Sequence, residues 1–190
     1  MKFICIGDSL TTGFGINKEF SWFELLKSSS NFELINKGVN GDTTTGILSR
    51  YYKDVIINSP CYLFIMAGTN DFLLNRSLNS VEENLSLIIK EALENNIIPF
   101  IGIPPFIDES LAIKQWDSNI NYSIVNNKLK SYRSYIITLC KKLNLKYIDL
   151  YSLFNDINKK HTGNSLYLDG IHPNKYTHKG IFEKIKKVMF

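Results

Sequence analysis

Four short polar blocks in the sequence contain the residue types that acyl transfer requires. The blocks are Gly7-Asp8-Ser9-Leu10, Gly38-Val39-Asn40-Gly41-Asp42, Gly68-Thr69-Asn70-Asp71 and Asp169-Gly170-Ile171-His172-Pro173. A serine hydroxyl is a weak nucleophile unless an adjacent general base takes its proton. The first block offers Ser9 as the nucleophile, and the last block offers His172 as the base. The pattern therefore predicts nucleophilic catalysis in which an acyl group passes through Ser9.

Two further requirements of this chemistry can be assigned within the same blocks. Asp169 stands three residues before His172, close enough to fold back in a tight turn and hold the imidazole in one tautomer. The negative charge that develops on a substrate oxygen needs an oxyanion hole of two or three hydrogen-bond donors. Gly41 offers an uncrowded backbone N–H, Asn70 offers a side-chain NH₂, and Ser9 offers its own N–H.

Each of these residues also has a structural interpretation that needs no catalysis. Ser9 could be the N-cap of a helix, Gly41 could serve a left-handed turn, and Asn70 could be an ordinary turn residue. Asp169 could cap a local turn. Three neighbouring carboxylates are expected to bond local backbone and brace the loops: Asp8, Asp42 and Asp71. The catalytic interpretation is favoured because the four blocks occur together in one chain.

The elements that must position the blocks are compact apolar runs alternating with amphipathic stretches. Strands are expected at Phe3–Ile6, Glu33–Asn36, Tyr62–Met66, Ile97–Ile103 and Lys146–Leu150, of which the first and third are predicted to be buried. Helices are expected over Phe20–Lys27, Thr43–Ile57, Ser80–Leu93, Ser123–Leu143 and Thr177–Val188, the third of them opened by a capping box of Ser80 and Glu83. This alternation predicts one α/β domain over residues 1–190, with a five-stranded parallel sheet and helices on both faces. Ligands bind beyond the carboxyl ends of such strands, where the four blocks fall.

Composition and charge exclude several other classes of protein. The chain is 44% hydrophobic and 21% charged, with a formal net charge of +4, which is ordinary for a globular domain. The densest basic run, Lys184–Lys187, lies in an amphipathic stretch and is expected to be the solvated face of a helix. Neither nucleic-acid binding nor stable membrane association is therefore expected. The first apolar run is too short for a signal-peptide core, and a cytoplasmic location is the simplest expectation.

Cysteine and histidine spacing gives no indication of a metal or a disulfide. The three cysteines stand at unrelated positions without a Cys-x-x-Cys pair: Cys5, Cys61 and Cys140. The three histidines show no metal-ligand spacing either. His161 and His178, which have no nucleophile near them in the sequence, are expected to be structural or exposed.

In their order along the chain, the four blocks resemble those of the SGNH-hydrolase (GDSL lipase/esterase) superfamily. The defining serine, glycine, asparagine and histidine of that family correspond to Ser9, Gly41, Asn70 and His172. Its Asp-x-x-His ending gives Asp169 as the third member of a catalytic triad, and the resemblance extends from residue 4 to about residue 180. It implies a flavodoxin-like three-layer α/β/α sandwich that needs no metal or organic cofactor. The similarity is greatest to small bacterial thioesterase, lysophospholipase and carbohydrate acetylesterase types.

The resemblance implies that the partner is a small-molecule acyl ester, thioester or acetylated sugar. The first hypothesis is an ester or thioester hydrolase that forms an acyl-enzyme on Ser9. The second is a carbohydrate O-acetylesterase, which would need a polar, open site. The third, from another class, is a catalytically silent module that binds a sugar or a lipid. A transferase in which an alcohol replaces water is not separable from the first hypothesis by sequence, and no heptad pattern indicates an oligomer.

The residues that line the substrate pocket are the part of the site that the sequence predicts least well. The segment Pro104–Asn121 is expected to be long and irregular, and such segments are often functional. Phe106 and Trp116 within it are expected to form one wall of the pocket, unless they pack on the core. Phe14 and Phe72 stand near the catalytic blocks and are expected to line the site as well.

Overall fold

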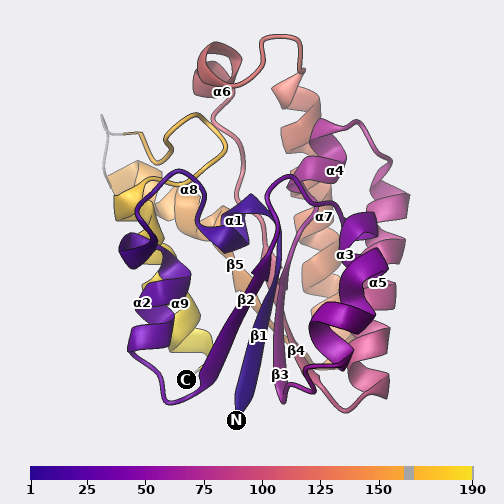
Figure 1. The fold of residues 1–190 in the computed structure, drawn as a ribbon. Helices are drawn as coiled ribbons and strands as arrows, with labels where there is room; N and C mark the ends of the chain where they lie inside the picture. The colour runs from indigo at the N-terminus through magenta and orange to yellow at the C-terminus, as the bar shows by residue number, and fades with distance from the viewer. Residues whose placement is uncertain (161–164, 190) are drawn as a thin grey trace.

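The protein is built on one parallel sheet, as the alternation of apolar runs predicts. The computed structural model describes residues 1–160 and 165–189. The sheet has five strands in the order β2-β1-β3-β4-β5, and every neighbouring pair is parallel (Figure 1). The strands are β1 (Lys2–Gly7), β2 (Glu33–Gly38), β3 (Tyr62–Met66), β4 (Ile98–Ile103) and β5 (Lys146–Asp149). The predicted α/β fold is therefore confirmed.

Helices cover both faces of the sheet, which gives three layers. One layer contains α2 (Trp22–Ser28), α8 (Leu150–Lys160) and α9 (Lys175–Met189), and the other contains α3 (Thr44–Tyr51), α5 (Leu78–Glu94) and α7 (Tyr122–Leu143). Shorter elements complete the chain: α1 (Ser9–Thr12), η1 (Lys18–Phe20), the π-helical turn η2 (Tyr52–Ile56), α4 (Thr69–Leu73) and α6 (Glu109–Gln115). In Figure 1 the first layer lies to the left of the sheet and the second to the right.

Alternation of side chains along β1 divides the interior into two cores. Phe3 and Cys5 point into the core beneath α2, α8 and α9, whereas Ile4 and Ile6 point into the core beneath α3, α5 and α7. All four side chains are buried, as expected for the central part of a parallel sheet. Burial on both faces holds the sheet rigidly, so its upper edge can position side chains accurately.

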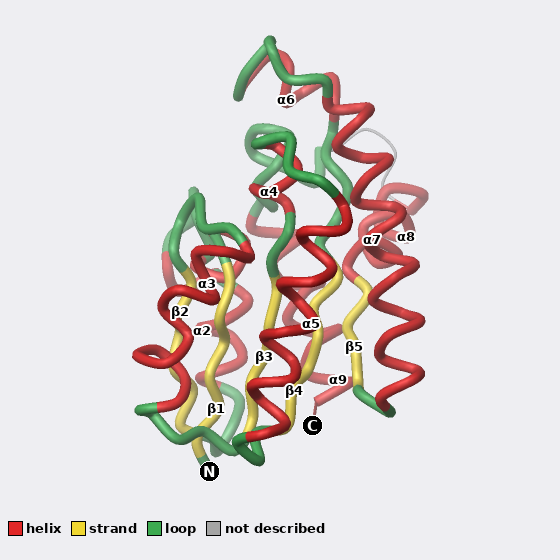
Figure 2. Tube along the Cα trace, turned by 90° about the vertical axis from the view of Figure 1, so that its right-hand side faces the viewer, coloured by secondary structure: helices red, strands yellow, loops and turns green. Residues whose placement is uncertain are grey.

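The four polar blocks meet at that upper edge. Because all strands are parallel, their carboxyl ends lie on the same side, beneath the loops and α4 and α6 (Figure 2). Gly7 ends β1 there, and a Cβ at this residue would collide with the Met66 carbonyl and the Thr11 hydroxyl. Glycine at this position therefore allows the end of β1 to lie close to both the end of β3 and helix α1.

Two helices lie where the sequence analysis did not place them. Leu150–Lys160, which was not predicted as a helix, forms α8 and buries Leu150 and Phe154 in the core shared with α9. Its apolar residues Leu150, Leu153, Phe154 and Ile157 follow the helical spacing that could have revealed it. The predicted irregular segment Pro104–Asn121 contains a short helix, α6, whose N-cap Asp108 accepts a hydrogen bond from Leu111 N–H.

The predicted capping box at Ser80 is wrong. The side chain of Ser77 accepts a hydrogen bond from the Ser80 backbone at 3.2 Å, so Ser77 is the N-cap and α5 begins at Leu78. Both serines come before the first apolar residue of the helical pattern, so either could be the N-cap. Only the backbone conformation decides which of them takes that role. Within the described residues, none of the helices combines the length and the apolar character that a bilayer crossing requires.

Candidate active site

Ser9 is the first residue of α1, directly beyond the carboxyl end of β1. Asp8, not Ser9, is the N-cap: its Oδ1 accepts a hydrogen bond from Leu10 N–H at 2.9 Å. The helix has only one turn, because Gly13 adopts a left-handed conformation (φ 79°) and its N–H bonds the Ser9 carbonyl. The Ser9 residue is only 6% accessible. Its hydroxyl therefore lies in a largely enclosed position with few alternatives for hydrogen bonding.

The hydroxyl of Ser9 is joined to His172 and Asp169 by a row of hydrogen bonds. His172 Nε2 lies 3.0 Å from Ser9 Oγ, and His172 Nδ1 lies 2.7 Å from Asp169 Oδ2. Oδ1 of the same carboxylate accepts the backbone N–H groups of Ile171 at 3.0 Å and His172 at 2.8 Å. The tight turn that the Asp-x-x-His spacing predicts is therefore present, and it fixes the direction of the imidazole.

Gly170 permits this turn to form against α6. It adopts a left-handed conformation (φ 95°), and a Cβ there would collide with the backbone of Ala112. Its carbonyl also accepts a hydrogen bond from Asp108 N–H at 2.9 Å. Another residue at this position would be strained and would push the Asp169–His172 turn away from α6.

The charge state of Asp169 suits the support of a histidine. Burial alone would raise the pKa of the Asp169 carboxyl, but the hydrogen bonds from His172 and Ile171 outweigh it and hold that pKa below its ordinary value. An ionised carboxylate next to Nδ1 keeps the proton on that nitrogen and leaves Nε2 free to accept one. The arrangement can therefore take a proton from Ser9 as the hydroxyl attacks an electrophile.

The loop that contains Gly41 lies against α1. Asn40 Oδ1 accepts a hydrogen bond from the Thr12 hydroxyl at 2.6 Å, and Val39 N–H donates to the Gly7 carbonyl at 3.0 Å. Gly41 itself is exposed, has a left-handed conformation (φ 76°), and has open space around the position of a Cβ. The bonds of Asn40 and Val39 thus hold this loop against α1, and Gly41 adds no side chain to it.

Asn70 is oriented by two acceptors on neighbouring loops. Its Nδ2 donates to the Asp42 carbonyl at 2.9 Å, and the same nitrogen lies 3.4 Å from Asp8 Oδ2. Because both neighbours are acceptors, the NH₂ and not the carbonyl oxygen of the amide faces the nucleophile block. The fold therefore brings together the blocks that contain Ser9, Gly41, Asn70, Asp169 and His172.

The three other carboxylates of the blocks brace the loops, in agreement with the expectation. Asp71 accepts the N–H of Thr44 at 2.9 Å and its hydroxyl at 2.8 Å, which ties α4 to α3. Asp42 accepts a hydrogen bond from Arg50 Nε at 2.7 Å. Asp8 is fully buried, and burial raises the pKa of its carboxyl to about 7.

Arg50 is a positioning residue that the sequence analysis missed. Besides binding Asp42, its guanidinium donates to the Gly7 carbonyl at 3.1 Å and to the Lys37 carbonyl at 2.8 Å. It also forms an ion pair with Asp54 at 2.8 Å, one turn further along the helical segment. The only local signal was this i,i+4 pair, which does not reveal that the guanidinium joins the ends of β1 and β2.

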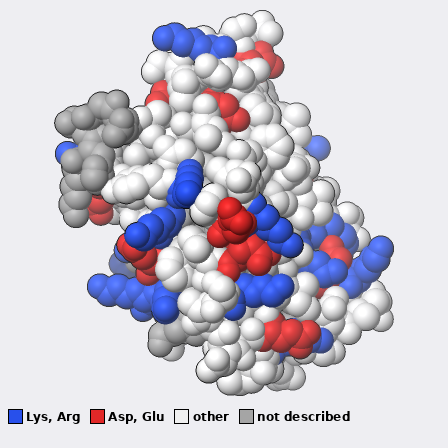
Figure 3. All heavy atoms as spheres, turned by 60° about the vertical axis from the view of Figure 1, so that its left-hand side comes forward, with Lys and Arg blue, Asp and Glu red and all other residues white. Residues whose placement is uncertain are grey.

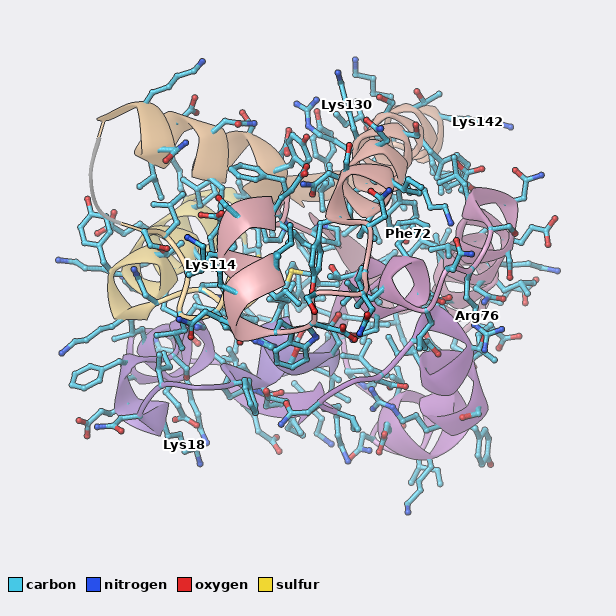
Figure 4. The ribbon with its side chains drawn as sticks, turned by 90° about the horizontal axis from the view of Figure 1, so that it is seen from above. Lys18, Phe72, Arg76, Lys114, Lys130 and Lys142 are labelled. Carbon is cyan, nitrogen blue, oxygen red and sulfur yellow. The ribbon has the colours of Figure 1, made fainter. Side chains whose placement is uncertain are left out.

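Two of the four aromatic residues predicted to line the pocket do contact the site. The rings of Phe14 and Trp116 lie 4.6 Å and 5.2 Å from the His172 ring, measured between centroids. Both side chains are nearly half exposed. Trp116 is the C-cap of α6. Seen from above, α6 lies over the middle of the molecule, beside the label of Lys114 (Figure 4), and this position brings Trp116 to the histidine.

The other two aromatic residues lie elsewhere. Phe72 is 1% exposed and packs edge-on against Tyr132, so the prediction that it lines the site is wrong. The first turn of α4 directs Asn70 toward the site, and Phe72, two residues later, points into the core. Phe106 is partly buried and contacts other aromatic rings, namely those of Tyr151, Phe154 and Tyr167. Phe106 therefore packs on the core, which is the second of the two possibilities that the sequence left open for it.

Of the two histidines expected to be structural or exposed, one lies in the described structure. His178 is fully buried, and its Nδ1 accepts the N–H of Trp22 at 3.2 Å. Burial, and to a lesser degree the nearby His172, lowers the pKa of His178 to about 4, so its ring is neutral. His161 lies outside the described residues.

Comparisons with known proteins agree with this arrangement. A family model described as GDSL-like Lipase/Acylhydrolase matches residues 3–185. The lipoprotein YqeF of Bacillus subtilis (strain 168) is 32% identical over 111 residues, which are 52% of this chain and 46% of the relative. An arylesterase of Vibrio mimicus is 30% identical over 112 residues, or 55% of this chain and 56% of the relative. The chain thus spans about half the length of the curated relatives that it matches.

A solved structure shows that the fold is shared over the whole chain. A member of the lipolytic protein G-D-S-L family from Veillonella parvula DSM 2008 superimposes with a TM-score of 0.84 at 22% identity. The superposition covers 100% of this chain and 98% of the other. The resemblance that the four sequence blocks indicate is therefore confirmed at the level of family and fold.

Proposed function

Because the chain belongs to the GDSL-like lipase/acylhydrolase family, we propose that it hydrolyses acyl esters or thioesters through an acyl-enzyme on Ser9. The observation that carries the proposal is the row of hydrogen bonds from Ser9 Oγ to His172 at 3.0 Å and from His172 to Asp169 at 2.7 Å. Family membership supports the type of reaction. The row of hydrogen bonds supports the assignment of roles to these particular side chains.

Acylation begins when Ser9 Oγ attacks the carbonyl carbon of the substrate. His172 Nε2 takes the hydroxyl proton, and Asp169 stabilises the imidazolium that forms. When the tetrahedral intermediate collapses, His172 gives the proton to the leaving alcohol or thiol. The acyl group then remains on Ser9 as an ester. A water molecule repeats the sequence with the same proton transfers and releases the carboxylic acid.

The oxyanion is stabilised by donors from three of the polar blocks: the first turns of α1 and α4 and the loop that contains Gly41. The Ser9 N–H belongs to the first turn of α1, where backbone N–H groups have no partner within the helix. Gly41, an exposed residue of a loop that is tied to α1, contributes its backbone N–H. The contact of Asn70 Nδ2 with Asp8, at 3.4 Å, is too long for a strong hydrogen bond, so this N–H can turn to the substrate oxygen.

The surroundings of His172 favour a substrate with an apolar group. Phe14 and Trp116 contact the histidine ring from different elements and present exposed aromatic surface beside it. Such surface gains from contact with an acyl chain or an aryl group that leaves water. We therefore extend the proposal to acyl groups longer than acetyl. The similarity to an arylesterase supports an ester as the scissile bond.

Hydrolysis of nitrophenyl esters from acetyl to palmitoyl tests the proposal. The wild-type protein should be active, Ser9→Ala should lose the activity, and Ser134→Ala, an exposed serine of α7, should keep it. A maximum at acetyl would favour the O-acetylesterase alternative. Full activity of Ser9→Ala would refute the assigned nucleophile. A folded wild-type protein that cleaves no ester or thioester and is not labelled by a fluorophosphonate would favour the binding module.

A further inference from the structure

A groove on the outer face of α9 shares no lining residue with the Ser9 site. It lies between η1, α2 and α9 and has a volume of about 470 Å³. Six residues line it: Phe20, Leu25, Lys175, Tyr176, Lys179 and Phe182. The volume falls within the range typical of sites for small molecules, about 300–1,000 Å³.

The floor of the groove is apolar and is contributed by three separate elements. Phe20 comes from η1, Leu25 from α2 and Phe182 from α9, and each is only partly buried. Their side chains meet there because α2 packs against α9, so the apolar surface is continuous. A hydrocarbon chain laid on this surface would remove it from water, at a gain of roughly 25 cal/mol per Å².

The rim of the groove is cationic. Lys175 and Lys179 are one helical turn apart and therefore lie on the same side of α9. Lys175 Nζ lies over the Phe20 ring, 3.3 Å from its centroid. No carboxylate lines the groove, and neither lysine forms an ion pair with a described residue. Glu183, one turn beyond Lys179, lines a neighbouring groove that shares Tyr176 and Lys179 with this one.

The wider surface carries charges of both signs. Figure 3 brings the side of α2 and α9 forward and shows Lys and Arg side chains interspersed with Asp and Glu side chains around uncharged surface. Like charges one turn apart on a helix repel each other, and an anion held between them would relieve that repulsion. The groove thus combines apolar surface for a chain with two lysines whose ammonium groups have no carboxylate partner among the described residues.

We propose that this groove binds a single-chain amphiphile with an anionic head, of the class of long-chain fatty carboxylates. The hydrocarbon chain lies on Phe20, Leu25 and Phe182, and the carboxylate lies between the ammonium groups of Lys175 and Lys179. Charge complementarity selects an anionic head over a neutral or cationic one. The volume selects a small molecule over a protein segment. The site does not depend on the hydrolysis proposed above.

Occupation of the groove would also join elements that support the Ser9 site. α9 begins at Lys175, three residues after His172, and its His178 side chain binds the first N–H of α2 at Trp22. A ligand that contacts α2 and α9 together holds this junction closed. Since it binds the folded chain alone, it raises the midpoint of thermal unfolding as its concentration increases.

The test uses dodecanoate below its micelle concentration and Ser9→Ala protein, in which no acyl group can be transferred. Calorimetry measures the affinity, and amide shifts in NMR spectra locate the ligand. Shifts are expected within residues 18–28 and 175–183. Lys175→Glu/Lys179→Glu should weaken binding at least about tenfold, since two attractive contacts become repulsive. The matched control, Lys130→Glu/Lys142→Glu on α7 (Figure 4), should leave the affinity unchanged.

A second variant tests the apolar floor without changing the charge. Leu25→Gln should also weaken dodecanoate binding, and dodecyltrimethylammonium should not bind to the wild-type groove. Shifts confined to Phe14, Trp116 and His172 would place the ligand in the Ser9 site and overturn the proposal. Equal losses in the α9 and α7 double variants would do the same. So would binding to anionic vesicles without binding to monomeric dodecanoate.

Discussion

Asp169 holds His172 through both of its carboxylate oxygens. Oδ2 lies 2.7 Å from the ring nitrogen Nδ1, and Oδ1 accepts the backbone N–H of His172 at 2.8 Å. One side chain therefore fixes both the turn of the main chain and the direction of the imidazole. Its replacement by the isosteric amide separates these two effects, since an amide offers one acceptor oxygen and not two.

Asp169→Asn is expected to lower kcat for ester hydrolysis by roughly ten-thousand-fold, because the amide no longer selects the productive tautomer of His172. The oxygen of the new amide can still accept the backbone N–H groups, so the turn should persist. Steady-state rates on a nitrophenyl ester measure the effect. Asp156→Asn, an exposed residue of α8, is the matched control and should keep wild-type rates. A variant at position 169 within tenfold of wild type would contradict the role assigned to this carboxylate.

Asn70→Ala is expected to lower kcat by about 10²–10³-fold with little change in KM, since an oxyanion donor acts mainly in the transition state. The control is Asn155→Ala on α8, which removes a hydrogen bond to the Tyr151 carbonyl. Thermal unfolding of both variants monitors the loss of their hydrogen bonds. If Asn70→Ala raised KM while kcat stayed constant, the side chain would bind the ground state instead.

Asp8 should make stability depend on pH. Burial is the main cause that raises the pKa of this carboxyl to about 7, with smaller contributions from Asp42 and Asp71. The ordinary value in an unfolded chain is about 3.9. Between these two values the folded protein keeps a proton that the unfolded chain has lost, so stability falls as the pH rises through this window.

Asp8→Asn removes this titration, and the variant should gain on wild type as the pH rises from about 4.5 to 8. The expected gain in the free energy of unfolding is on the order of a few kcal/mol. Urea unfolding at the two pH values measures it. Asp156→Asn should differ from wild type by the same amount at both. A difference for Asp8→Asn that does not vary with pH would show that Asp8 titrates normally.

Trp116→Ala is expected to change acyl-chain selectivity. The aromatic ring borders His172 at 5.2 Å, and its loss should lower kcat/KM for long esters by about tenfold relative to acetyl. Phe14→Ala should act in the same direction. Tyr52→Ala, an exposed aromatic residue of η2, provides the control. Unchanged selectivity at normal stability would mean that the substrate does not touch this surface.

The sequence by itself determined the features that depend on local chemistry. Apolar runs that end at glycine or proline predicted the three central strands, because a buried parallel strand is apolar on both faces. The Asp-x-x-His spacing of Asp169 and His172 predicted a turn that brings carboxylate to imidazole. The order of the four blocks predicted the family. Helix boundaries were less accurate, as at Ser77 and Ser80, because neighbouring residues compete for the same capping role.

The tertiary structure alone decided which distant residues meet. Ser9 and His172 are 163 positions apart, and the order and pairing of the strands set their 3.0 Å contact. The same holds for Arg50, whose guanidinium binds the ends of β1 and β2. Phe72 and Trp116 look equally plausible as pocket residues, yet one is buried in the core and the other borders the histidine. The direction of a side chain depends on how whole helices pack. The free energy of that packing comes from contacts throughout the core, so no short segment of sequence determines it.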